Sequence, residues 1–377
     1  MGSKDGLLVI EVDGKQLKLE GDSFYCSSFE FSNKCYDISR GRIHFFSEQL
    51  EKVNLTENGV SYLGGKVVVK YSNQTIFSGF VSGTKSSNEG YSTSVEFFLS
   101  SPEFWLLSGR TVVSWNVSGD YSQILNKILS NYNSKFSGYN VDLPYTLPNS
   151  LIRMHDKHEN DYDYVKRVSR MNGAFFYSLD GKVKIAPIKH DPSNSFKLKY
   201  DGKIGKNFFV KKIKFSTDIT GIPKNISNAY IKEDKYQNIS SPLVSASDKI
   251  GDGNFADGVC ANIDDSISLN FVNPNIDSDE TSKNLSKIEY KLKSINLSKC
   301  EITCSFWPEL KVGGKMTLSG FSKTVDNSYI ITSLTHKYEN SEGTSNFSTT
   351  ISLNSDSICG ASSFSSLGSI GKLRSFF

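Results

Sequence analysis

Two stretches of this 377-residue chain, one near each end, repeat the same order of strand-like segments. The first runs from Gly64 to Ser100 and the second from Gly313 to Asn354. Each opens with Gly-Gly-Lys and a short apolar run, turns into a second apolar run, and reaches a third after a polar loop that contains Glu-Gly. Any three-strand meander shares part of this pattern, but the matched Gly-Gly-Lys and Glu-Gly positions favour a true internal repeat. The sequence therefore predicts two related β modules.

The composition fits a globular, β-rich protein. Hydrophobic residues make up 37% of the chain, charged residues 22% and aromatic residues 12%, which excludes a disordered chain and favours strands. The net charge is +3 and both signs are mixed along the chain, whereas a dedicated nucleic-acid binder has a clustered basic excess. No stretch reaches the ~18–20 apolar residues of a membrane span, and residues 1–6 lack the apolar core of a secretory signal. We therefore expect no stable membrane insertion and folding in a reducing cytoplasm.

Strands dominate both ends of the chain. Short runs of apolar and aromatic residues separated by polar turns predict strands at 7–12, 24–31, 41–46, 66–71, 75–84 and 91–99, then at 206–215, 315–319, 329–338 and 346–353. Residues 217–278 hold many Asn, Asp, Ser and Gly residues and predict a loop-rich insertion. The last ~20 residues are rich in Ser and Gly, which is typical of a tail.

Helical spacing occurs in three places between these blocks. Asp120 can cap a helix that continues to Tyr132, and Asn160 can cap a second over 161–171 that Asn172-Gly173 ends. A hairpin over 174–186 follows, with Asp180-Gly181 at a type I′ turn. The third helix spans 280–297, with Asp279 and Glu280 at its positive end.

Several polar clusters are candidates for chemistry, and each also has a structural interpretation. His155 and His158, with carboxylates nearby, could bind a metal or act as acid and base, but they also suit the polar start of a helix. Cys300 and Cys304 could ligate a metal, but they also share one face of a strand. The remaining candidates suit solvated loops, helix ends or partner contacts: Asp264, Asp265, Asp277, Asp279 and Glu280, the segment 248–257, and Lys166, Arg167 and Arg170. Phosphate-binding glycine motifs and a G-x-S-x-G sequence are absent. We assign no catalytic, cofactor-binding or metal-binding residue and expect no enzyme.

Two segments resemble a known family. The run from His158 to Tyr177 has an acidic and aromatic helix start, a basic helix, then Gly and an aromatic strand. The C-terminal segment has Gly314 at a turn, Tyr-x-Ile-x-Ser-x-x-His over 329–336, and a Thr-rich strand over 348–353. Both resemble the phage late-control D family and the hub half of the type VI secretion spike protein VgrG. The resemblance covers about residues 1–355.

The resemblance implies an α+β, mainly β fold, with two β-barrel-like tube modules on either side of a mixed insert. On this basis we expect a first tube module at 1–105 and an α+β insert at 106–200. The start of the second tube module, with a loop-rich and helical insertion, falls at 201–299. The rest of that module falls at 300–355, and a C-terminal tail at 356–377. The chain lacks the long β-helical spike of VgrG, which implies that the spike is a separate chain.

The resemblance also implies a function. Such a hub is a homotrimeric ring that joins a six-fold tail tube to a three-fold central spike and lets the tape measure protein and DNA pass. Its partners would be the tail tube protein, the spike protein and other baseplate proteins, in a virion assembled in the bacterial host cytoplasm, with no cofactor. A hub of a type VI or extracellular contractile injection system is the nearest alternative. A cell-wall hydrolase or a glycan-binding tail protein would be a different class.

Overall fold

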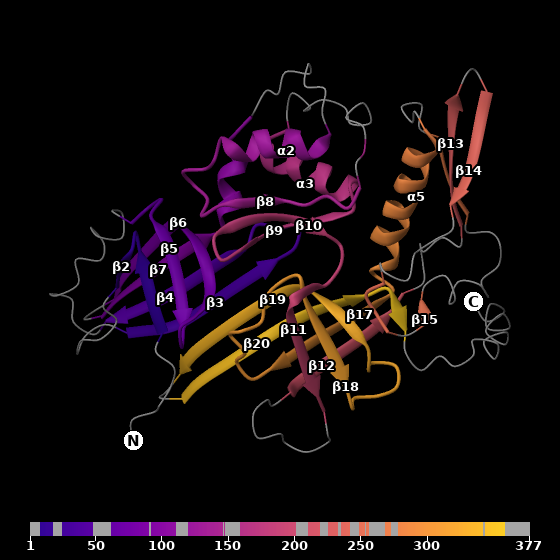
Figure 1. The fold of residues 1–377 in the computed structure, drawn as a ribbon. Helices are drawn as coiled ribbons and strands as arrows, with labels where there is room; N and C mark the ends of the chain where they lie inside the picture. The colour runs from indigo at the N-terminus through magenta and orange to yellow at the C-terminus, as the bar shows by residue number, and fades with distance from the viewer. Residues whose placement is uncertain are drawn as a thin grey trace, which may run out of the picture.

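In the computed structural model the chain is mainly β, which confirms the expected fold class (Figure 1). The structure describes residues 8–17, 25–47, 62–89, 92–110, 120–145, 147, 159–200, 210–218, 225–232, 235–241, 249–252, 254–255, 268–272, 278–341 and 344–358. Within these residues one sheet of 13 strands runs through the molecule, and a small mixed sheet with two helices lies against it.

The N-terminal part of the large sheet comes from the first 100 residues. Its strands are β1 (Leu8–Val12), β2 (Lys15–Gln16), β3 (Tyr25–Lys34), β4 (Arg40–Ser47), β5 (Lys66–Tyr71), β6 (Gln74–Glu89) and β7 (Ser92–Ser100). They are ordered β3-β4-β7-β6-β5-β1-β2. Alternate residues of these strands point to one face, so Phe31, Phe45 and Phe97 meet in a single buried core.

The C-terminal part repeats this order with strands from distant parts of the chain. These are β11 (Asp191–Lys199), β12 (Val210–Thr217), β17 (Ser298–Cys304), β18 (Gly314–Ser319), β19 (Ser328–Ser341) and β20 (Thr344–Ser355). Their order is β12-β17-β20-β19-β18-β11, which matches β3-β4-β7-β6-β5-β1 position by position. One detail differs, because β11 pairs with β18 in parallel whereas β1 pairs with β5 antiparallel.

Two irregularities in strand pairing also occur at matched places in the two parts. The β6–β7 register shifts between Val81 and Gly83, and the β19–β20 register shifts at the matching place between Ile331 and Ser333. A second shift in β3, between Cys26 and Ser28, has its counterpart in β12 between Val210 and Lys212. Bulges are specific features of a strand pair, so their recurrence at matched positions supports a repeated module more strongly than strand order alone.

The two glycines that open the repeats explain part of this match. Gly64 and Gly313 have positive φ values of 78° and 82°, a conformation that a side chain would strain. Each donates its N–H at 2.8 Å to the residue before the bulge, Val81 in one module and Ile331 in the other. In both modules, therefore, a glycine turn forms a hydrogen bond to the residue next to the bulge and holds the bulge in place.

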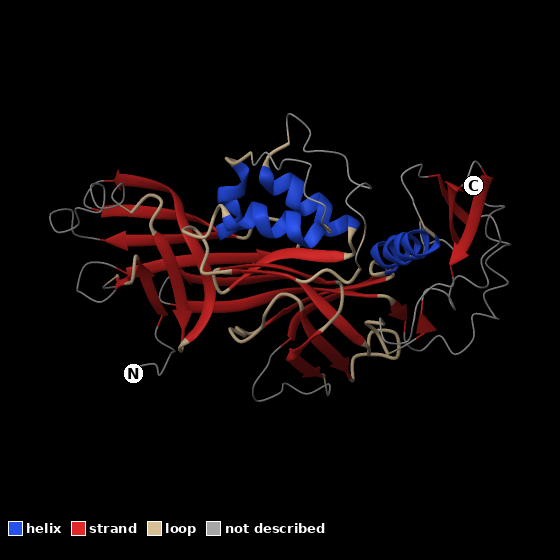
Figure 2. Ribbon diagram, turned by 45° about the horizontal axis from the view of Figure 1, so that its top comes forward, coloured by secondary structure: helices blue, strands red, loops and turns tan. Residues whose placement is uncertain are grey.

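The insert packs two helices on a small sheet, above the large one in Figure 2. Helix α2 (Tyr121–Ser130) and helix α3 (Asp161–Met171) cover the strands β8 (Tyr139–Val141), β9 (Ala174–Leu179) and β10 (Lys182–Pro187), and the 3-10 helix η2 (Pro102–Leu107) leads in from β7. The predicted caps are confirmed: Asp120 accepts from Gln123 N at 3.1 Å and Asn160 from Asp163 N at 2.8 Å. Positive φ at Asp180 and Gly181 confirms the predicted hairpin turn.

The range 217–278, predicted as a loop-rich insertion, also contains strands that the sequence analysis did not predict. Strands β13 (Asn225–Lys232), β14 (Lys235–Ser241) and β16 (Ser268–Val272) form a three-stranded sheet beside α5 (Asp279–Ser294). Their abundant polar residues hid the strand pattern. The short strand β15 (Asn254–Phe255) pairs with β21 (Ser357–Ile358), so the first residues of the range 356–377 lie within the fold. Ser278 caps α5, and Ile288 is buried on the inner side of this helix.

Candidate functional site

The two modules are joined by direct strand pairing. The second half of β19 lies antiparallel to β3, with a register that runs from Ser333 opposite Lys34 to Glu339 opposite Ser28. The first half of the same edge of β19 pairs with β18. One long strand therefore belongs to its own module at one end and holds the neighbouring module at the other.

Aromatic rings fill the core side of this junction. Phe29 of β3 lies with its ring centroid 5.4 Å from Tyr338 of β19 and 6.1 Å from Phe306. Phe306 also meets Tyr71 of β5 at 4.7 Å and Phe347 of β20 at 5.4 Å. Aromatic pairs at such spacings add to the free energy of area burial by about 0.5–1.5 kcal/mol each. The modules are thus fixed to each other by packing as well as by backbone hydrogen bonds.

His336 of the Tyr-x-Ile-x-Ser-x-x-His pattern lies inside this junction. It is 1% exposed, faces Phe31 across the strand pair and packs 5.3 Å from the Phe306 ring. Its Nδ1 is 3.1 Å from Thr349 Oγ1, which also accepts a hydrogen bond from Trp307 N. Burial, with a smaller contribution from Lys311, lowers the pKa of His336 to about 3. The pattern therefore marks a neutral packing residue and no general base.

Replacing His336 with Gln should change how stability depends on pH. The folded-state pKa lies below the ordinary value of 6.5, so the unfolded chain binds more protons as the pH falls from 6.5 towards 3. His336 alone should then lower the free energy of unfolding of the wild type by up to about 1.4 kcal/mol per pH unit in that window. The stability advantage of the wild type over the Gln variant at pH 7 should shrink towards pH 4.5 in urea titrations. A constant difference would contradict a neutral buried His336.

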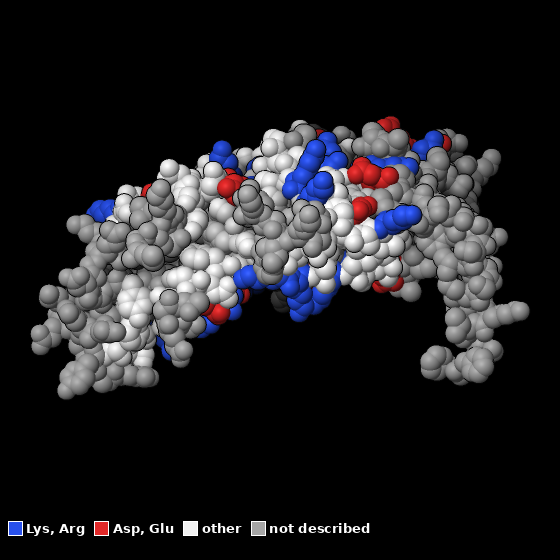
Figure 3. Space-filling model, turned by 90° about the horizontal axis from the view of Figure 1, so that it is seen from below, with Lys and Arg blue, Asp and Glu red and all other residues white. Residues whose placement is uncertain are grey.

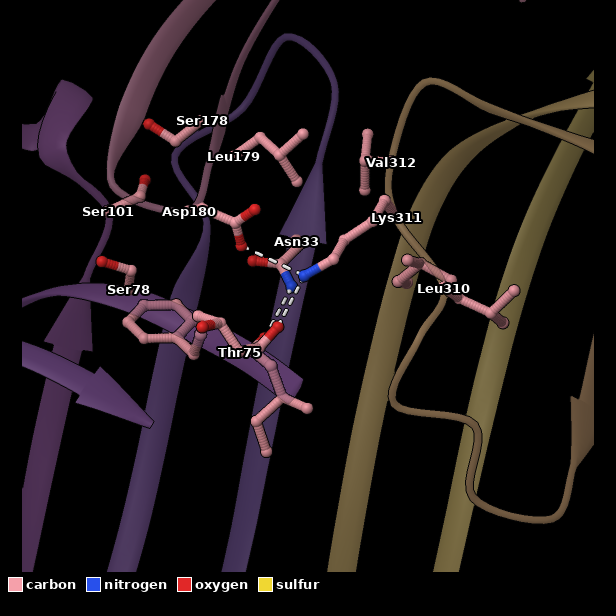
Figure 4. A pocket seen from close by; sticks show the side chains of 13 residues that line it. Asn33, Thr75, Ser78, Ser101, Ser178, Leu179, Asp180, Leu310, Lys311 and Val312 are labelled. Atoms are coloured by element: carbon pink, nitrogen blue, oxygen red, sulfur yellow. Dashed lines mark hydrogen bonds and ion pairs between the residues drawn. The ribbon is translucent and has the colours of Figure 1, made fainter. Parts of the chain in front are cut away.

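Lys311 connects both modules to the insert (Figure 4). Its ammonium donates at 2.7 Å to the backbone oxygen of Thr75 in β6 and lies 3.1 Å from Asp180 Oδ1 in the insert hairpin. Asn33 of β3 points into the same small pocket and donates to the backbone oxygen of Ile76 at 3.2 Å. The pocket is a meeting point of three parts of the chain, and Lys311 of the second module bonds to the first module and to the insert there.

Substituting Lys311 with Met should loosen this meeting point. Met keeps the apolar stem but removes the donor to Thr75 O, which should cost about 1–3 kcal/mol because that oxygen is left without it in a confined site. Asp180→Asn is the matched control: it leaves the Thr75 contact intact, tolerates the left-handed backbone, and removes an ion pair worth at most about 1 kcal/mol at a half-exposed carboxylate. Urea unfolding should rank the two variants in this order, and equal losses would contradict it.

The candidates for chemistry that the structure describes occupy structural positions. His155, His158, Asp264, Asp265 and Asp277 lie outside the described residues. Asp279 and Glu280 occupy the first turn of α5, where they suit the helix dipole. Arg167 of α3 is held by Glu159, with its Nη2 at 2.7 Å, and stacks over Tyr164. Within the described part of the chain, no three His, Cys, Asp or Glu side chains lie close enough to hold a metal ion.

Cys300 and Cys304 take the structural interpretation. Both are buried free thiols on the core side of β17, and Cys304 Sγ donates to Thr349 O at 3.6 Å. Burial raises the pKa of each thiol to about 12, which keeps them protonated and unreactive. The two cysteines therefore act as small apolar residues of the second module.

Comparison with known proteins finds solved structures of similar fold. No family model and no curated protein matches the sequence. Among solved structures, a tail protein from Neisseria meningitidis MC58 superposes with a TM-score of 0.65 at 9% identity, over 93% of this chain and 97% of that one. The 43 kDa tail protein of prophage MuSo2 from Shewanella oneidensis gives 0.62 at 12% identity, over 92% and 97%. The chain shares the fold of these two tail proteins.

A protein of secretion machinery also has a similar fold. An Escherichia coli protein described as a component of the type VI secretion system, similar to the T4 tail proteins gp27 and gp5, gives a TM-score of 0.56 at 14% identity, over 92% of this chain and 76% of that one. These likenesses confirm the resemblance to the phage tail and VgrG-type group. Within the described residues, none of the helices combines the length and the apolar character needed to cross a membrane.

The junction residues were not singled out from the sequence. Phe29, Phe306 and Lys311 contact partners hundreds of residues away, so local spacing carries no sign of them. His336 was the visible signal, because it ends a strand pattern that resembles the late-control D and VgrG sequences. Aromatic residues at corresponding positions of both modules would also have pointed to the junction in the sequence. The modules differ there, because Phe347 of β20 corresponds to Thr93 of β7.

Proposed function

We propose that the chain is the baseplate hub of a contractile phage tail. In this proposal three copies form a ring that joins the six-fold tail tube to the three-fold central spike. The observation that carries the proposal is the duplicated module: strand order, bulges and opening glycine all occur twice in one chain. Three chains with two equivalent modules each present six similar surfaces to a tube and three identical ones to a spike.

The polar side of the joined sheet is our candidate for the channel wall. Across the junction Glu30 of β3 lies opposite Lys337 of β19 on one side and Arg42 of β4 on the other. Arg42 in turn forms an ion pair with Glu96 of β7. Charges of both signs alternate on this side, which suits a wall past which DNA and the tape measure protein move without being held.

This role needs a scaffold and no reaction, so we propose that the protein is not an enzyme. Its partners would be the tail tube protein, the spike protein, the tape measure protein and other baseplate proteins, in a particle assembled in the bacterial cytoplasm. The division into two tube modules, an insert and a C-terminal tail belongs to the same proposal. Strand pairing supports placing β11 with the second tube module, because it lies beside β18.

Native mass spectrometry of the full chain, alone and with tube and spike proteins, tests the proposal. We expect a trimer that binds one trimeric spike, and a ring in cryo-EM averages of assembled particles. A monomer within the assembled particle would overturn it. The matched control is a spike protein from an unrelated tail, which should not bind.

A hub of a type VI or extracellular injection system is the second candidate, and the likeness to the Escherichia coli protein supports it. The genes beside this one distinguish the two roles. Capsid and terminase genes would point to a phage, and their absence beside a complete sheath and tube set would point to an injection device.

A further inference from the structure

We propose that β12 of one copy pairs with the second half of β6 of the next copy. This inference rests on the proposed ring and names the two strand edges that would close it. The two edges are different from each other, so the contact is head to tail, and such a contact closes into a ring when the rotation between copies divides a full turn.

The matched bulges provide the first argument. Aligned on one bulge, Gly83–Glu89 of β6 correspond to Ser333–Glu339 of β19. Aligned on the other bulge, residues 212–217 of β12 correspond to residues 28–33 of β3. Inside the chain, β19 and β3 pair along these edges. Among the strands that the structure describes, their counterparts on β6 and β12 have no partner on the same edges.

The second argument is the exposed apolar surface beside β12. Ile213 occupies the position of Phe29, yet Ile213 is 38% exposed whereas Phe29 is 2% exposed in the junction. Tyr200 is 43% exposed and stacks on Phe321 at 5.1 Å, and these rings line a groove with Ile213 and Phe215. In the first module, β19 covers the apolar surface beside β3. The corresponding surface beside β12 of the second module is exposed to solvent, as expected if another copy covers it in the ring.

The charges of β12 fit a selective edge. Lys211, Lys212 and Lys214 lie on this strand, and Figure 3 shows Lys and Arg side chains gathered on the side of the molecule where β12 lies in Figure 1. Lysines on an edge strand oppose pairing with arbitrary strands, including a second β12. They remain compatible with a partner edge that has few positive charges. The second half of β6 is such an edge, because it carries Lys85 followed by two serines.

The register follows from the junction. Thr335 lies opposite Ser32, with their hydroxyl groups 3.3 Å apart, and the equivalent residues are Lys85 and Ser216. Lys337 lies opposite Glu30, and the equivalent residues are Ser87 and Lys214. Antiparallel pairing of the two copies should therefore bring Lys85 of one copy directly opposite Ser216 of the next.

Disulfide trapping in the full chain tests this register. A Lys85→Cys, Ser216→Cys double variant should form cross-linked species of two and three chains under mild oxidation, because directly opposed residues lie within the ~7 Å Cα separation that a disulfide spans. Both side chains are exposed, so the variant should unfold at the wild-type temperature. A Lys85→Cys, Lys212→Cys variant is the matched control, since its second thiol is displaced by four residues, or about 13 Å along the strand. Wild type controls for the native cysteines.

The outcomes separate this inference from the proposed hub. A trimer by native mass without the Lys85–Ser216 cross-link would overturn the β6–β12 pairing and leave the hub standing. Equal cross-linking in the Lys212 control would overturn the register. A monomer at every concentration up to hundreds of micromolar, with no cross-link, would overturn both. A cross-linked ladder that ends at three chains would support both.

Discussion

Phe31→Ala should destabilise the protein by about 3–5 kcal/mol, because it removes a whole buried ring from the junction of the two modules. Phe31 is fully buried, stacks on Phe29 at 5.0 Å and on Phe77 at 5.3 Å, and faces His336 across the strand pair. Removal of the ring leaves a cavity between residues from both modules, so neither module can close around it alone. Urea unfolding followed by tryptophan fluorescence measures the loss.

Phe98→Ala is the matched control for this substitution. Phe98 is also an aromatic residue in a central strand of the first module, but it points to the polar side of β7, where Arg42 lies over its ring at 5.6 Å. Its removal leaves no enclosed cavity, so the loss should be about 1 kcal/mol. A Phe31→Ala loss as small as that of Phe98→Ala would contradict the junction as a fixed unit of packing.

Features set by neighbouring residues were predictable from the sequence. The helix caps at Asp120 and Asn160, and the Asp180-Gly181 turn, depend on contacts within a few residues, and all three are confirmed. The repeat was visible because Gly64 and Gly313 each open a strand after a turn that needs positive φ. For the two caps, the side chain and the backbone N–H that it accepts from lie three residues apart.

Features that depend on distant segments were not predictable in the same way. Strand β11 pairs in parallel with β18, more than 100 residues later, and a parallel pair has no connecting turn to reveal it. The partners of His336 come from β3, β20 and the segment after β17, so the histidine pattern could be noticed but its role could not be read from it. The candidates for chemistry were charged residues, histidines and cysteines, whereas the junction consists mainly of aromatic rings with His336 and Lys311.

Asp356 should be the most sensitive charged residue of the second module. Its carboxylate accepts hydrogen bonds from Ile250 N at 3.0 and 3.1 Å and from Gly251 N at 3.0 Å, and it lies 3.2 Å from Lys291 Nζ of α5. Its side chain is 5% exposed and that of Lys291 is 12% exposed. Asp356→Ala should therefore cost about 3–5 kcal/mol, since it leaves a buried ammonium and two N–H groups without this acceptor.

Two further variants make this expectation specific. Glu339→Ala removes the carboxylate of an exposed pair with Lys337 and should cost less than about 1 kcal/mol. Lys291→Met placed in the Asp356→Ala background should recover part of the loss, because the buried ammonium that has lost its Asp356 contact is then removed. If the double variant were less stable than Asp356→Ala alone, the buried charge would not be the cause. Asp356 also holds the backbone of Ile250 and Gly251, so cleavage by a protease near residues 249–252 should increase in Asp356→Ala and return towards the wild-type rate in the double variant.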